Sequence, residues 1–160
     1  MAADTTTRAS LFLSWCHEDQ TLKKDLLRRL MPHLAILNGV RVDWWEDSHL
    51  LGGEDLRAAI LRGLAACDYG LLLLSPAYFA SAFVTAHELP RFIGPWADKA
   101  ALPVDLRRVP LDGSRDLCGI DQTLVFRHQG KAFNELSGAG RDGFASELAT
   151  QVRRRVLSGR

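Results

Sequence analysis

Apolar residues along the chain fall into two alternating kinds of segment. Segments of the first kind are short runs rich in leucine, β-branched and aromatic residues, and they predict strands. The five predicted strands are residues 11–15, 40–45, 69–75, 101–111 and 123–127. The run 69–75 is apolar on both faces, which is typical of a central strand covered by helices on each side.

Segments of the second kind place apolar side chains three and four residues apart, which predicts amphipathic helices. The predicted helices are residues 21–31, 56–67, 81–92 and 144–156. We expect Asp19 or Thr21 to cap the first of them. Pro90 is the weak point of the third, because a proline inside a helix removes a backbone hydrogen bond.

Strands and helices alternate along the chain, so the pattern predicts an α/β protein with a parallel sheet. The expected architecture is a flavodoxin-like three-layer sandwich whose five strands follow the order 2-1-3-4-5. Residues 1–9 are polar and rich in threonine, and we expect a flexible leader there. Residues 10–158 form the single predicted domain, in which residues 110–143 are rich in loops.

Composition narrows the class of protein further. The 160 residues carry a net charge of +1, which gives no electrostatic drive toward nucleic acid or an anionic membrane. The longest apolar run, Leu71–Leu74, is too short for a membrane helix, and the first ten residues lack the apolar core of a signal sequence. Three cysteines lie far apart without a CxxC motif, which favours a reducing compartment. We therefore expect a cytoplasmic protein.

The expected ligand site lies where the strand order reverses. In open parallel sheets, ligands bind beyond the carboxyl ends of the strands at that point, here between the first and third strands. The two segments that leave these strands combine aromatic rings, carboxylates and histidines. They contain Trp15, His17, Glu18, Asp19, Tyr78, Phe83, His87 and Glu88. Rings and carboxylates together suit a planar, cationic or polyhydroxylated ligand.

Several kinds of catalysis lack their motif. The chain has no GxxxxGK[ST] loop and no GxGxxG after its first strand, so a phosphate cradle for a nucleotide triphosphatase or a Rossmann enzyme is missing. It has no GxSxG nucleophile elbow. No two histidines lie one helical turn apart, and we expect no metal site. Any catalysis is therefore expected to depend on carboxylates and aromatic rings.

Four motifs in order resemble those of the TIR (Toll/interleukin-1 receptor homology) domain in its bacterial form. Residues 12–19, FLSWCHED, are similar to the opening pattern F-[IV]-S-Y-x-H-x-D of that family. Similar too are Trp45-x-Asp47 followed by Leu50, Gly53 and Ile60; residues 75–81 followed by Phe83 and Glu88-Leu89; and Pro103-Val104-x-Leu106-Arg107. The resemblance covers about residues 10 to 110 and implies the same flavodoxin-like fold.

The resemblance also implies an activity, because many TIR domains cleave NAD at the nicotinamide–ribose bond. It implies Glu88 as the catalytic residue, and NAD as a substrate with no cofactor. The implied substrate-binding residues are Ser14, Trp15, Trp45, Asp47, Gly53 and Phe83. It further implies self-association, a sensor domain or partner protein that provides the trigger, and a role in bacterial immune or cell-suicide signalling.

Other interpretations stay open at this stage. Some TIR domains serve only as adaptors, and here such a module would assemble through its helices and residues 46–55. Glu88 could be a solvated helix carboxylate, and Trp15 and Trp45 could be core or interface aromatics. An unrelated receiver or flavin domain is a third interpretation, but residues 14–16 lack the acidic pair that a receiver needs after its first strand.

Overall fold

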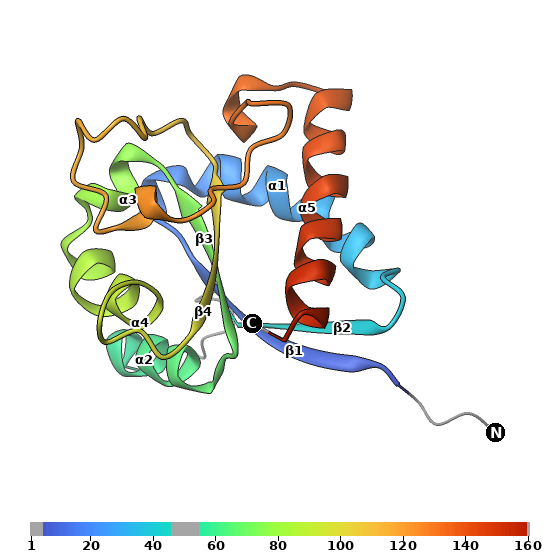
Figure 1. Ribbon diagram of the computed structural model, residues 1–160, viewed down its shortest axis with the longest axis horizontal. Helices are drawn as coiled ribbons and strands as arrows, with labels where there is room; N and C mark the ends of the chain where they lie inside the picture. Colours follow the sequence, from blue (N-terminus) through green and yellow to red (C-terminus); the bar gives the residue numbers. More distant parts are fainter. Residues whose placement is uncertain (1–4, 46–54, 160) are drawn as a thin grey trace.

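A parallel β-sheet lies between two layers of helices in the computed structural model, which describes residues 5–45 and 55–159 (Figure 1). Its strands are β1 (Thr7–Ser14), β2 (Val40–Trp45), β3 (Tyr69–Leu74) and β4 (Ala100–Asp105). They follow the order β2-β1-β3-β4, and every neighbouring pair is parallel. The predicted α/β class and the parallel sheet are confirmed, with β1 and β3 side by side at its centre.

Helices cover both faces of the sheet (Figure 1). One layer contains α1 (Gln20–Ala35) and α5 (Ala139–Leu157), and the other contains α2 (Leu56–Ala66), α3 (Pro76–Ala80) and α4 (Leu89–Phe92). Alternate residues of β1 point to opposite layers, so Leu11 and Leu13 pack with α1 and α5 while Phe12 packs with the other layer. No helix within the described ranges is both long and apolar enough to cross a membrane.

The predicted fifth strand is not confirmed, because the sheet has four strands among the described residues. In the segment 123–127 only Phe126 pairs with β4: its N–H donates to the Pro103 carbonyl (2.8 Å), and its carbonyl accepts from the Asp105 N–H (3.0 Å). The preceding bond of this ladder would need an N–H at Pro103, and proline has none. Beyond Phe126 the His128 N–H turns to the Lys131 carbonyl instead. The pairing therefore stops after one bridge.

The region between β4 and α5 is built mostly of loops, as the sequence predicts. It contains two short 3-10 helices, η4 (Ile120–Gln122) and η5 (Phe133–Glu135). The predicted strand 101–111 is shorter than expected, since β4 ends at Asp105. At the other end of the chain β1 begins at Thr7, so the last residues of the expected leader belong to the sheet.

The helix predicted over residues 81–92 is present over residues 82–92, with a π-helical turn in its middle. Ser75 accepts a hydrogen bond from the Tyr78 N–H and caps α3, whose first residue is Pro76. After α3 comes η3 (Val84–Glu88), a π-helical turn in which the Leu89 N–H bonds to the Val84 carbonyl, and then α4. A proline ring clashes with the carbonyl four residues before it, so Pro90 favours this wider turn over a regular α-helix.

Candidate functional site

A cleft of about 910 Å³ opens at the carboxyl ends of β1 and β3. Its walls come from β1 and the residues after it, from the end of β2, from the start of α2, and from α3 and η3. The short 3-10 helix η1 (His17–Asp19) follows β1 and forms part of the rim. The position agrees with the rule that ligands bind where the strand order of an open α/β sheet reverses.

Glu88 lies in this cleft as the last residue of the π-helical turn η3. The side chain is deeply placed, since the residue is only 6% exposed. Its Oε1 accepts a hydrogen bond of 2.6 Å from the Ser14 hydroxyl. Ser14 is the last residue of β1 and is fully buried. The carboxylate of Glu88 is therefore fixed against the end of the central strand.

A second buried hydroxyl lies beside the first. The Tyr78 hydroxyl is 2.7 Å from the Ser14 Oγ, and Tyr78 is fully buried within α3. Burial raises the pKa of Tyr78 well above its ordinary value; the hydrogen bond with Ser14 lowers it, and the negative charge of Glu88 raises it further. The phenol thus stays protonated at neutral pH.

The backbone of Tyr78 is held by another polar group, the Ser75 hydroxyl. This oxygen accepts the Tyr78 N–H (3.0 Å) and donates its own proton to Asp19 Oδ2. Asp19 is 2% exposed and also accepts a 3.1 Å hydrogen bond from the Arg107 Nε. Residues that follow β1, β3 and β4 are thereby tied together directly behind the cleft.

Aromatic rings line the cleft around the carboxylate. Trp45 stacks on Phe12 with ring centroids 5.1 Å apart and an interplanar angle of 7°. Phe83 lies beside His87, with 4.9 Å between centroids, and the Arg57 guanidinium lies 5.8 Å from the Phe83 ring. Flat rings and a guanidinium beside an acid can enclose a ligand that has planar and charged parts.

Trp15 exposes little surface to the cleft, although the sequence predicts it as a contact with the substrate. It is 8% exposed, and the Lys23 ammonium lies 4.4 Å from its ring centroid. The His17 ring is 4.6 Å away from it. Trp15 still lines the cleft, although most of its ring packs in the core with α1 and α5.

The structure brings together most of the residues that the sequence singles out. Trp15, Trp45, Phe83 and Glu88 line one cleft. Ser14 lies beneath Glu88 and offers no surface to a ligand. The predicted contacts Asp47 and Gly53 lie outside the described residues.

Tyr78 was expected in the ligand site as part of the segment that leaves the third strand, but its hydrogen bond with Ser14 was not predicted, and no binding role was predicted for Arg57. A signal for Tyr78 was present, because Ser75-Pro76 marks a helix start and so places Tyr78 in its first turn above the strand end. No sequence signal places Arg57 beside Phe83, since the two residues come from α2 and from the residues that precede η3. Among the described residues, no group of three or more His, Cys, Asp or Glu side chains could hold a metal ion.

Comparison with known protein families agrees with the motifs. A family model described as TIR domain matches residues 11–137 of the chain. The matched range contains Ser14, Tyr78 and Glu88, and all four strands except the first residues of β1. No curated protein matches the chain.

Proposed function

Since this chain belongs to the TIR domain family, we propose that it cleaves NAD at the bond between nicotinamide and ribose. The observation that carries the proposal is the position of Glu88. The residue is 6% exposed and lines the cleft at the carboxyl ends of β1 and β3, together with aromatic rings. A surface carboxylate of a helix would be largely solvated instead.

The chemistry of NAD cleavage needs few protein groups. In ordinary glycoside hydrolysis one carboxyl group must protonate the leaving group. The nicotinamide of NAD is already a cationic pyridinium, so it takes the electron pair of the broken C–N bond and leaves as a neutral molecule. Positive charge then develops on the ribose. A single fixed carboxylate such as Glu88 can stabilise that charge or bind the ribose hydroxyls.

The product depends on what attacks the ribose cation. Attack by water gives ADP-ribose, and attack by a group of the same molecule gives a cyclic isomer. In this proposal Phe83 stacks on a ring of the substrate, and Trp15 and Trp45 help to enclose it. Asp47 and Gly53 remain predicted contacts to the ribose or the phosphates.

Chromatography of NAD incubated with concentrated protein tests the proposal. We expect the native chain to release nicotinamide and the Glu88→Gln variant to lose roughly 100-fold or more of that rate, because the amide keeps the shape of the side chain without its charge. The matched control is Glu147→Gln on α5, in the layer across the sheet, which should keep the native rate. Circular dichroism checks that both variants fold. Undiminished release by Glu88→Gln would refute the assignment.

Self-association is part of the proposed function, since TIR domains commonly self-associate. We expect the specific rate of nicotinamide release to rise with protein concentration as neighbouring copies stabilise the active form. Rates measured beside light scattering at each concentration test this. The proposed setting is a bacterial immune or cell-suicide pathway triggered by a sensor domain or partner. A native chain that assembles but releases no nicotinamide would favour the adaptor function.

A further inference from the structure

We propose that Ser14 and Tyr78 are positioning residues, which hold the Glu88 carboxylate in one orientation through a chain of two hydrogen bonds. The inference rests on the proposed function of Glu88 and adds to it the residues through which the fold controls that carboxylate. It also changes the role predicted for Ser14 from a contact with the substrate to a contact with the catalytic residue.

The direction of both hydrogen bonds follows from counting protons. A serine hydroxyl has one proton to donate, and the Ser14 Oγ donates it to Glu88 Oε1 over 2.6 Å. The contact of 2.7 Å between Ser14 and Tyr78 must then use the phenol proton. Tyr78 thus donates to Ser14, and Ser14 donates to Glu88. Such a chain is cooperative, because each bond polarises the next.

The far end of the chain is anchored in the fold. Tyr78 is fully buried, and its backbone N–H donates to the Ser75 hydroxyl. Ser75 donates to Asp19, which also accepts from Arg107. The phenol therefore has a fixed position relative to the ends of β1 and β3, and the orientation of Ser14 is fixed with it.

The backbone around Glu88 explains why such a support matters. Glu88 ends the π-helical turn η3, and Pro90 follows two residues later. A π-turn is closed by i→i+5 hydrogen bonds, so it departs from the regular geometry of an α-helix. The hydrogen bond from Ser14 adds a constraint on the direction of the Glu88 carboxylate beyond the one that the backbone gives. Because Ser14 is fully buried, its hydroxyl is placed for Glu88 and not for a ligand.

The test compares Tyr78→Phe with Tyr69→Phe. These are the chain's two tyrosines, and Tyr69 lies at the opposite end of β3. Tyr78→Phe removes only the donor oxygen and keeps the buried ring, so we expect it to fold. The readout is the carboxyl ¹³C resonance of Glu88 in protein labelled at glutamate, identified by its absence in Glu88→Gln. We expect this resonance to move in Tyr78→Phe and to stay in place in Tyr69→Phe.

Ser14→Ala provides a second variant, with the exposed Ser146→Ala of α5 as its control. It should move the Glu88 resonance further than Tyr78→Phe does, because it removes the donor that touches the carboxylate. An unchanged resonance in both Ser14→Ala and Tyr78→Phe would overturn the proposal. This measurement needs no substrate, so its result does not depend on whether the protein cleaves NAD.

Kinetics separates positioning from substrate binding. With NAD as substrate, we expect kcat to fall roughly 10-fold to 100-fold in Ser14→Ala and less in Tyr78→Phe, with KM near the native value. A raised KM with native kcat would return Ser14 to substrate binding and overturn the positioning role. A native protein without activity, but with the expected movement of the resonance, would refute the proposed function and leave the hydrogen-bond chain standing.

Discussion

The position of Trp45 in the cleft depends on a single residue, a glycine in the neighbouring helix. Gly63 lies in α2, and a Cβ atom added there would come within 2.3 Å of the Trp45 indole. Phe12 stacks on the same tryptophan. The Trp45 ring thus has little room to move. It can occupy this position in the cleft wall because Gly63 has no side chain.

Gly63→Ala therefore has an effect opposite to the usual one for a helix. In an unobstructed helix this substitution stabilises by about 1 kcal/mol. Here we expect it to destabilise by roughly 1–3 kcal/mol, because Trp45 must leave its place against Phe12. Urea unfolding measures the change. In a Trp45→Leu background the obstruction is removed, and the same substitution should be neutral or stabilising. Equal effects in the two backgrounds would contradict this account.

Among the elements, an ion pair between the buried Asp105 and the partly buried Arg127 holds the segment before η5 against the sheet. Arg127 Nε donates to Asp105 Oδ2 over 2.6 Å, and Arg127 also donates to the Val109 carbonyl over 3.0 Å. Asp105 is fully buried, and this burial raises its pKa, while the hydrogen bond and charge of Arg127 lower it. Arg127 is therefore the cation that makes an ionised Asp105 tolerable in the core.

Removing that cation is expected to be costly. Arg127→Met should lower the free energy of unfolding by about 3 kcal/mol at pH 7, since a buried carboxylate is left without its partner. The exposed Arg154→Met of α5 is the control and should change it by less than about 0.5 kcal/mol. The difference in the free energy of unfolding between the native chain and Arg127→Met should become smaller as the pH falls, because protonated Asp105 carries no charge. A difference that stays constant with pH would contradict the assignment.

How far the elements follow from the sequence depends on where their stabilising contacts lie. The first three strands were predicted because each is a local segment rich in apolar or β-forming residues, and the alternation of strands and helices predicted the parallel sheet. The segment 123–127 has the residues of a strand, yet Leu124 is 95% exposed and only Phe126 pairs with β4. Besides that pairing, the segment is held by the ion pair of Arg127 with Asp105, two residues that lie 22 positions apart, and no local sequence pattern predicts such a contact.

The candidate site also has a part that could be predicted from the sequence and a part that could not. Glu88, Phe83, Trp15 and Trp45 were found because they belong to motifs, and the topology brings them into one cleft. The buried hydrogen bonds beneath Glu88 were not predicted. They join residues 64 and 74 positions apart, and hydroxyl partners leave no periodic pattern in a sequence.

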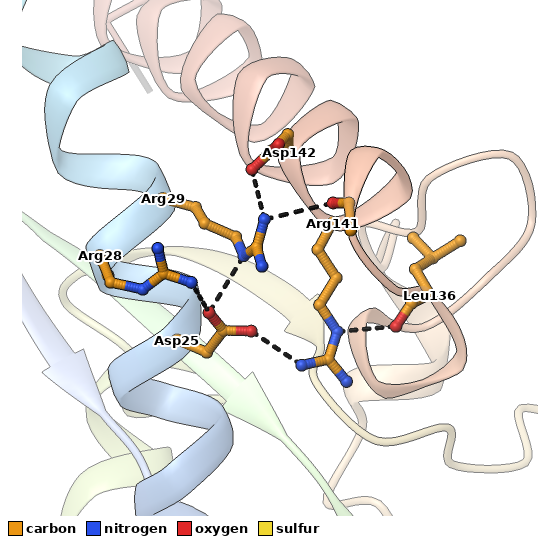
Figure 2. A network of polar contacts seen from close by, with 7 residues as sticks. Asp25, Arg28, Arg29, Leu136, Arg141 and Asp142 are labelled. Carbon is orange, nitrogen blue, oxygen red and sulfur yellow. Dashed lines mark hydrogen bonds and ion pairs between the residues drawn. The ribbon is translucent and has the colours of Figure 1, made fainter.

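At the scale of the whole molecule, a network of charges joins α5 to α1 (Figure 2). Asp25 of α1 accepts hydrogen bonds from Arg28 (2.6 Å) and Arg29 (3.0 Å) of its own helix and from Arg141 of α5 (2.8 Å). Arg29 also pairs with Asp142 of α5. The network therefore attaches the first turn of α5 to α1.

The network makes the stability of the whole fold depend on pH. Burial raises the pKa of Asp25, but hydrogen bonds from Arg141, Arg28 and Arg29 outweigh it and bring the pKa from 3.8 to about 2. The folded chain thus holds this proton less tightly than the unfolded chain. The pairing contributes about 2 kcal/mol, which is fully present above about pH 4 and is lost as the pH falls toward 2.

Asp25→Asn should remove that contribution and lower the Tm by roughly 4–8 °C at pH 7. The exposed Asp43→Asn of β2 is the matched control and should leave the Tm near its native value. Calorimetry from pH 7 down to pH 3 follows the effect, and the Tm difference between native chain and Asp25→Asn should begin to close below about pH 4. A difference that is absent at pH 7, or that grows as acid is added, would mean that the ion pairs of Asp25 do not stabilise the fold.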